Sequence, residues 1–156
     1  MADERRVISV IVINEASVLS RISGLFSGRG YNIDSLTVAP IPESKYSRIT
    51  IVTQGSVRVI EQIIKQLHKL IPVLKVYEHE NLVEKEMALV KFPISECLAD
   101  IAALCEAYNG KIVNVGSDVI ICNVADIPQR VDNFLTAIKR FHPKEIVRSG
   151  VVAMEM

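Results

Sequence analysis

Residues 5–40, RRVISVIVINEASVLSRISGLFSGRGYNIDSLTVAP, decide the fold, because an apolar run, a short polar turn, an amphipathic stretch and a second apolar run follow one another directly. Residues 7–13 are β-branched apart from Ser9, which predicts a central strand buried on both faces. Apolar residues recur at helical spacing over residues 17–27, and Gly28 and Gly30 end that predicted helix. The polar turn between strand and helix, residues 14–17, offers side chains that can cap the helix.

The segment that follows completes one repeating order of elements. Residues 31–39 and 47–53 alternate in polarity and predict two strands that pair as a hairpin, with a loop opened by Pro40 and Pro42. Residues 59–70 predict a second helix, which Pro72 ends, and residues 73–78 predict a fourth strand. The predicted order is therefore βαββαβ.

The same order recurs in the second half of the chain. Strands are predicted over residues 87–92, 111–115, 119–124 and 145–152, with one helix over residues 98–108 and another that starts near Asp126 and Pro128. We therefore expect an α+β fold of two ferredoxin-like βαββαβ units, in domains 5–79 and 84–156 joined by a polar linker, residues 79–85. Such a unit leaves one sheet face uncovered by helices, and the apolar first strand predicts a homodimer.

Composition narrows the functional classes. Lysine plus arginine equals aspartate plus glutamate, 18 of each, so the formal net charge is zero and we expect neither nucleic acid nor a membrane surface as a partner. The apolar runs stop short of membrane-spanning length. Cys97, Cys105 and Cys122 are odd in number and lack CxxC spacing, which disfavours a disulfide framework and a structural zinc site and fits a cytoplasmic location.

The polar turn after the first strand favours binding over catalysis. Glu15 is the one side chain there that can act as an acid or base, whereas the start of a helix presents unpaired backbone N–H groups that can hold a small anion. Cys105 lies on the apolar stripe of its predicted helix and Cys122 lies in a predicted strand, so both are expected to be buried structural thiols. We expect no catalytic residue and no metal site on this chain.

The polar residues of the first segment, residues 5–40, can also be explained by structural roles alone. Capping and turn preferences alone favour Asn14 as a helix cap and allow Asn32 as a turn residue.

Other functional classes lack the sequence features that they require. A ligand-sensing transcription regulator would need a helix-turn-helix motif and a basic face, and the sequence contains neither. A small ferredoxin-like enzyme would need a paired base and nucleophile, which are also missing. A stand-alone amino-acid-sensing regulator without a catalytic partner stays open as an alternative function.

Several blocks of the chain resemble one known family closely. These blocks are NEASVLSRISGLFSGRGYNIDSLTVAP, SRITIVTQG, EQIIKQLHKLIPVLKV and RSGVVAM, which follow one another in matching order from about residue 5 to the C-terminus. They resemble the small, regulatory subunit of acetolactate synthase, also called acetohydroxyacid synthase. The resemblance implies an N-terminal ACT domain, a C-terminal ferredoxin-like domain and a homodimer.

The resemblance also implies a function in branched-chain amino acid biosynthesis. Such subunits carry no cofactor themselves. They activate a separate catalytic subunit that uses thiamine diphosphate, Mg²⁺ and FAD, and they make it sensitive to feedback inhibition by valine. Because one methylene group gives only about 1 to 3 kcal/mol of discrimination, the choice of valine over leucine or isoleucine rests on the family.

The resemblance further implies an effector site between two ACT domains. One protomer contributes the turn after its first strand and the other contributes its second strand. The family usually has glycine where this chain has Ser17, so the added side chain either crowds the ligand or is accommodated as a helix cap or a ligand contact. The implied site residues are Asn14, Ala16, Ser17, Val18 and Leu19 in the turn, and Asn32 and Ile33 in the second strand.

Overall fold

The computed structural model describes residues 2–78 and 80–156, which form two compact units. The first unit comprises residues up to 82 together with residues 153–156, and the second unit comprises residues 83–152. The predicted first domain ends, and the predicted linker begins, at His79, which lies outside the described residues. Residues 153–156, placed in the second domain by the sequence prediction, belong to the first compact unit.

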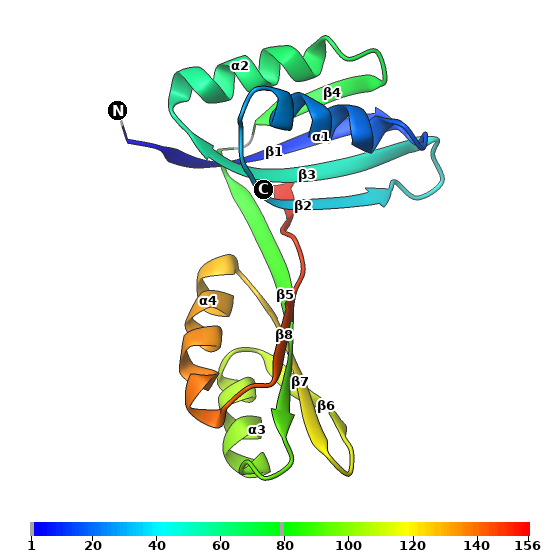
Figure 1. Ribbon diagram of the computed structural model, residues 1–156. Coiled ribbons are helices and arrows are strands. Elements are labelled where there is room, and N and C mark those ends of the chain that lie inside the picture. The colour runs from blue at the N-terminus through cyan, green and yellow to red at the C-terminus, as the bar shows by residue number, and fades with distance from the viewer. Residues whose placement is uncertain (1, 79) are drawn as a thin grey trace. The chain divides into compact units, whose positions relative to one another are not determined.

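The first unit is a four-stranded antiparallel sheet with two helices. The strand order is β2-β3-β1-β4, and Figure 1 shows α1 and α2 on the same face of this sheet. The order of elements along the chain is the predicted βαββαβ. These elements are β1 (Glu4–Ile13), α1 (Val18–Gly28), β2 (Ile33–Pro40), β3 (Tyr46–Gly55), α2 (Val57–His68) and β4 (Val73–Glu78).

Strand β1 is central, as its apolar sequence predicts. All of residues 7–12 are buried, including Ser9. Alternate residues of β1, Ile8, Val10 and Val12, belong to the core cluster that also contains Ile22 of α1 and Ile63 of α2. Burial on both faces therefore explains why this strand is an almost unbroken apolar run.

The second unit repeats the arrangement. Its sheet order is β6-β7-β5-β8, with β9 also paired to β5, and α3 and α4 lie on one face (Figure 1). Its core contains Phe92, Phe134, Cys105 and Cys122, and both thiols are fully buried as predicted. The elements are β5 (Leu82–Pro93), α3 (Leu98–Ala107), β6 (Gly110–Val115), β7 (Val119–Asp126), α4 (Pro128–Ala137), the 3₁₀ turn Ile138–Phe141 and β8 (Glu145–Arg148). The last strand, β9 (Val152–Glu155), belongs to the first compact unit apart from Val152.

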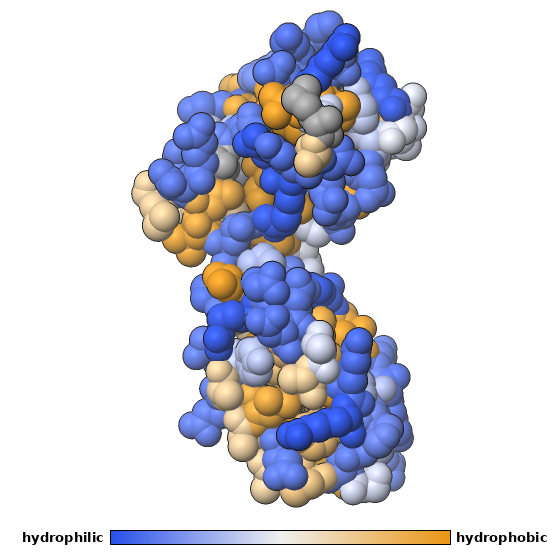
Figure 2. Space-filling view, turned by 90° about the vertical axis from the view of Figure 1, so that its left-hand side faces the viewer, coloured by the Kyte–Doolittle hydropathy of each residue, from blue (hydrophilic) through white to orange (hydrophobic). Residues whose placement is uncertain are grey.

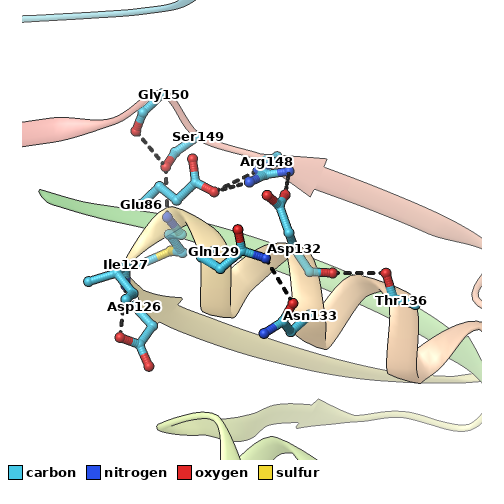
Figure 3. A network of polar contacts seen from close by, with 11 residues as sticks. Glu86, Asp126, Ile127, Gln129, Asp132, Asn133, Thr136, Arg148, Ser149 and Gly150 are labelled. Atoms are coloured by element: carbon cyan, nitrogen blue, oxygen red, sulfur yellow. Dashed lines mark hydrogen bonds and ion pairs between the residues drawn. The ribbon is translucent and has the colours of Figure 1, made fainter. Parts of the chain in front are cut away.

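The prediction of one continuous last strand over residues 145–152 was wrong. The structure ends β8 at Arg148 and begins β9 at Val152. Ser149 lies in the gap and bonds to Met87 twice: its N–H donates to the Met87 carbonyl at 2.8 Å, and its hydroxyl accepts the Met87 N–H at 2.9 Å. Because a side chain replaces one partner of the backbone ladder here, the regular strand stops (Figure 3).

The surface mixes polar and apolar side chains. Figure 2 shows patches of hydrophobic residues between hydrophilic ones on the face that it presents. Among the large apolar residues that are exposed, Ile71 is 93% exposed and Leu74 is 60% exposed. Of the helices within the described residues, none is long and apolar enough to cross a membrane.

A buried carboxylate fixes the start of α4. Asp126 is 4% exposed, and its side chain accepts hydrogen bonds from the Ile127 N–H at 2.7 Å, Arg130 at 2.6 Å and Asn109 at 2.9 Å. Burial alone would raise the pKa of Asp126, but these bonds and one from Lys85 outweigh it and hold the pKa below its ordinary value of 3.8. The ionised form is therefore part of the folded unit.

We predict that Asp126→Asn destabilises the second unit by about 2 kcal/mol at neutral pH, because charge-assisted bonds are lost. A carboxyl group with a lowered folded pKa contributes stability above its unfolded pKa, and this contribution is lost as the pH falls. The difference between parent and variant should therefore shrink below about pH 4. Urea unfolding of parent and variant, from neutral pH to below about pH 4, measures this difference in the free energy of unfolding. Asp118→Asn, at an exposed position in the same unit, is the control, and a constant difference at all pH values would contradict the prediction.

Candidate functional site

The turn between β1 and α1 is anchored by its backbone. The Ile13 N–H donates to the Pro72 carbonyl and the Asn14 N–H donates to the Lys45 carbonyl, both at 3.0 Å. These bonds join the turn to the segments that lead into β4 and β3. Residues 14–17 are all exposed. The fold thus fixes the turn in place while leaving its surface open to a ligand.

The turn and the first turn of α1 present unpaired backbone donors. The helical ladder begins with the Val18 N–H on the Glu15 carbonyl at 3.3 Å and the Arg21 N–H on the Ser17 carbonyl at 3.1 Å. Between and before these bonds, the N–H groups of Ala16, Ser17, Leu19 and Ser20 have no hydrogen-bond acceptor among residues 2–78 and 80–156. Four such donors at the positive end of a helix dipole suit a carboxylate ligand.

Ser17 fits this turn without strain. Its φ of −85° and ψ of −11° lie in the right-handed helical region, which any residue adopts, so no glycine is needed at this position. The expectation that a side chain of the turn caps α1 was wrong, because the Ser17 hydroxyl accepts no bond from the first turn. A backbone already in helical geometry at Ser17 accounts for this difference, since a capping residue usually adopts an extended conformation.

The apolar side chains of the turn have different environments. Val18 is 3% exposed and packs in the core of its own unit, so its side chain is not part of the open surface. Leu19 is 38% exposed and stands beside the free donors in sequence. Of the two, Leu19 is the apolar group that a ligand at the turn can contact.

The second predicted segment begins β2. Ile33 is half-buried against the core, and Asn32 is exposed. The Asn32 side-chain amide donates to the Asp34 carboxylate at 2.7 Å, and the Asn32 carbonyl accepts the Thr53 hydroxyl at 2.5 Å. Sequence reasoning missed Asp34, which lies at an irregularity in the pairing of β2 with β3. A bulge leaves no clear signal in a single sequence.

One chain does not bring these two segments together. Ile33 pairs with Thr53, which in turn pairs with Arg6, whereas the turn follows Ile13 at the other end of β1. Arg6, which marks the position of Ile33 along the sheet, is seven residues from Ile13 in β1, and this corresponds to about 23 Å. A site that uses both segments therefore requires two copies of the chain.

Other reactive groups do not form a second candidate centre. A hydrogen bond with Cys105, together with burial, raises the pKa of the Cys122 thiol, which disfavours the reactive thiolate. His142 contacts Glu96 at 2.9 Å on the surface. Within the part of the chain that the structure describes, no three His, Cys, Asp or Glu side chains gather as a metal-binding group.

The chain matches known proteins over its whole length. Residues 8–75 match the family described as the AHAS small subunit-like ACT domain, and residues 85–156 match the small subunit of acetolactate synthase. The acetolactate synthase isozyme 3 small subunit of Escherichia coli K12 is 44% identical over 96% of this chain and 94% of its own length. The probable acetolactate synthase small subunit of Archaeoglobus fulgidus is 40% identical over 96% of each chain.

A solved structure agrees with this assignment. The crystal structure of the acetolactate synthase small subunit from Thermotoga maritima superposes with a TM-score of 0.91 at 34% sequence identity, covering 98% of each chain. Both units of the chain are therefore accounted for by one kind of protein.

Proposed function

Because the chain belongs to the acetolactate synthase small-subunit family, we propose that it activates a separate catalytic subunit and makes that subunit sensitive to valine. The observation that carries this proposal is the match over the whole chain, which includes both units. The alternative of a stand-alone sensor would leave the second unit, which matches the small-subunit family specifically, without a role. Thiamine diphosphate, Mg²⁺ and FAD then belong to the catalytic partner in the proposed complex.

The free N–H groups of the turn support an effector site for an amino acid. The ligand carboxylate would accept bonds from Ala16, Ser17 and the first turn of α1. The amide oxygens of Asn14 and of Asn32 from a second copy would accept bonds from the ammonium group, and Asp34 would add a negative charge beside Asn32. Leu19 and Ile33 would contact the branched side chain.

A homodimer would complete this site. Strand β2 is an edge strand, so one side of its backbone has no neighbour in the sheet of its own chain. Val38 of this strand is 44% exposed. Edge strands of two copies can pair side by side, and this would bring the second-strand segment of one copy near the turn of the other. Valine would then favour one dimer arrangement, and a coupling of about 1 to 3 kcal/mol suffices for feedback.

The test is acetolactate formation by the catalytic subunit from the same source, with and without this chain, titrated with valine. We expect a rise in rate on adding the chain and a fall as valine is added. A rise without the fall would leave an activator that does not sense valine. No rise would contradict the proposed function itself. Leucine and isoleucine titrations would measure how far the site discriminates by side-chain size.

We predict that Asn14→Ala raises the valine concentration for half-inhibition about tenfold, because one hydrogen bond to the charged ammonium group is lost. Folding and activation should stay at the parent level, since the Asn14 side chain makes no hydrogen bond within the described residues. Valine titration of the reconstituted enzyme measures this. Loss of activation with unchanged inhibition would contradict the site assignment.

A further inference from the structure

Asp34 carries an exposed carboxylate that is held beside Asn32. The Asn32 side-chain amide donates to this carboxylate at 2.7 Å. Among the described residues, Asp34 forms no ion pair, and the Asn32 amide is the one partner of its side chain. Each oxygen of a carboxylate can accept two hydrogen bonds. Asp34 therefore keeps most of its capacity to accept bonds from a ligand.

The backbone at the start of β2 fixes the position of this pair. The Thr53 hydroxyl donates to the Asn32 carbonyl at 2.5 Å. The pairing of β2 with β3 shifts its register between Ile33 and Ser35, so Asp34 is the extra residue of a β-bulge. Bulges are frequent next to active sites, where they redirect a side chain. The position of the Asp34 carboxylate thus follows from the pairing of two strands.

The bond between the two side chains also fixes the orientation of the Asn32 amide. A carboxylate accepts hydrogen bonds and donates none, so the amide nitrogen faces Asp34 and the amide oxygen is left to accept a bond from a ligand. An ammonium group at that oxygen would have a negative charge within reach on the same amide. A hydrogen bond between two charged groups is roughly twice as strong as one between neutral groups. Asp34 would therefore hold the ammonium group more firmly than the Asn32 amide alone.

We infer that the Asp34 carboxylate is the counter-ion of the effector's ammonium group and restricts the site to α-amino acids. The free N–H groups of the turn recognise a carboxylate, which 2-oxo acids and other carboxylic acids with the same side chain also carry. The amino acid alone adds a cation, so Asp34 distinguishes it from these anions. A ligand without the ammonium group would bring a second negative charge into the site of Asp34. This inference rests on the proposed function, since it assumes the effector site between two copies.

The test measures calorimetric binding of two ligands to the full chain: valine, and 3-methylbutanoate, which has the same side chain and carboxylate but no amino group. The parent should bind valine at least about tenfold more tightly than 3-methylbutanoate. Asp34→Asn should weaken valine binding at least about tenfold, and its binding of 3-methylbutanoate should be unchanged or stronger. Asp34→Glu keeps the charge and should bind valine within about threefold of the parent.

Glu61→Gln is the matched control for the change of charge. Glu61 is an exposed carboxylate of α2 and lines a surface cavity with Glu78 of β4, the sheet edge opposite β2. This variant should bind valine within about twofold of the parent. Circular dichroism melting confirms that each variant is folded.

The outcomes separate this inference from the proposed function. If the parent binds valine and Asp34→Asn binds it equally well, the role of Asp34 is wrong and the proposed function stands. Equal weakening of both ligands by Asp34→Asn would also overturn the role, because local damage to β2 would not distinguish the two ligands. A parent that binds 3-methylbutanoate as tightly as valine would overturn it as well. If the parent binds no valine, the proposed sensing function and this inference fail together.

Discussion

Gly110→Ala is expected to destabilise the second unit by about 3 kcal/mol or more. A Cβ atom at Gly110 would lie 2.3 Å from the Asn123 carbonyl oxygen and 2.6 Å from a Val124 methyl group. The first neighbour is backbone of the adjacent strand β7, so rotation of a side chain cannot relieve the contact. The start of β6 would have to move away from β7, and the helix–strand corner before it would open.

Hydrogen exchange of the full chain, followed by mass spectrometry, measures this effect locally. Faster exchange is expected in β6 and β7, while the first unit should exchange as in the parent. Gly116→Ala is the matched control in the same hairpin, where a Cβ would meet no atom closer than 3.8 Å. Equal exchange in the two variants would contradict the steric explanation.

The reason for this glycine could not be deduced from the sequence. Asn109 and Gly110 follow a predicted helix, where a glycine normally signals a left-handed turn. The structure places Asn109, with φ of 59°, in that left-handed position instead. Gly110 is required because a neighbouring strand passes close to it, and the pairing of β6 with β7 brings that strand from more than ten residues away.

Much of the first unit, in contrast, followed from local pattern. The unbroken apolar run of residues 7–12 predicted a central strand, and the structure places β1 between β3 and β4. Fully buried strands carry this signal because both faces exclude polar residues. The last strand of the chain was predicted without its break, because Ser149 interrupts it through bonds to Met87 that lie 62 residues away in sequence.

The buried charged residues of the second unit could likewise not be predicted from the sequence. Glu86 is 7% exposed and bonds to Arg148, which also contacts Asp132 of α4 at 2.7 Å (Figure 3). Glu86 belongs to a strand with alternating exposure, where a charged residue is normally assigned to the solvent face. Its partner comes from the far end of the unit's sequence, so the ion pair appears only in three dimensions.

The free backbone donors of the candidate site could be predicted from the sequence, but the geometry of the turn could not. A polar turn between an apolar strand and an amphipathic helix indicates free N–H groups, and the structure leaves four of them without acceptors. The sequence could not show that Val18 faces the core, nor that Ser17 already has helical geometry. These features depend on the position at which the helix begins, which is uncertain by a few residues from sequence alone.

That geometry leads to the largest functional effect we predict. Ser17→Asp should raise the valine concentration for half-inhibition more than 100-fold, which corresponds to about 2.7 kcal/mol. The new carboxylate would take up the free N–H groups near Ala16 and Leu19 and would repel the carboxylate of the ligand. Aspartate at this position also favours the helix dipole, so the first unit should melt at the same temperature as the parent or higher.

Unchanged or increased stability makes this variant a test of the site itself, since loss of inhibition cannot then be attributed to unfolding. Valine titration of the reconstituted enzyme and calorimetric valine binding to the chain alone measure the effect. Ser23→Asp places the same charge on an exposed position of the same helix and should leave inhibition within twofold of the parent. Ser17→Gly, which removes the side chain at this position, should keep inhibition. Parent-like inhibition of Ser17→Asp would show that valine binds elsewhere, because no ligand carboxylate could share these four donors with a neighbouring aspartate.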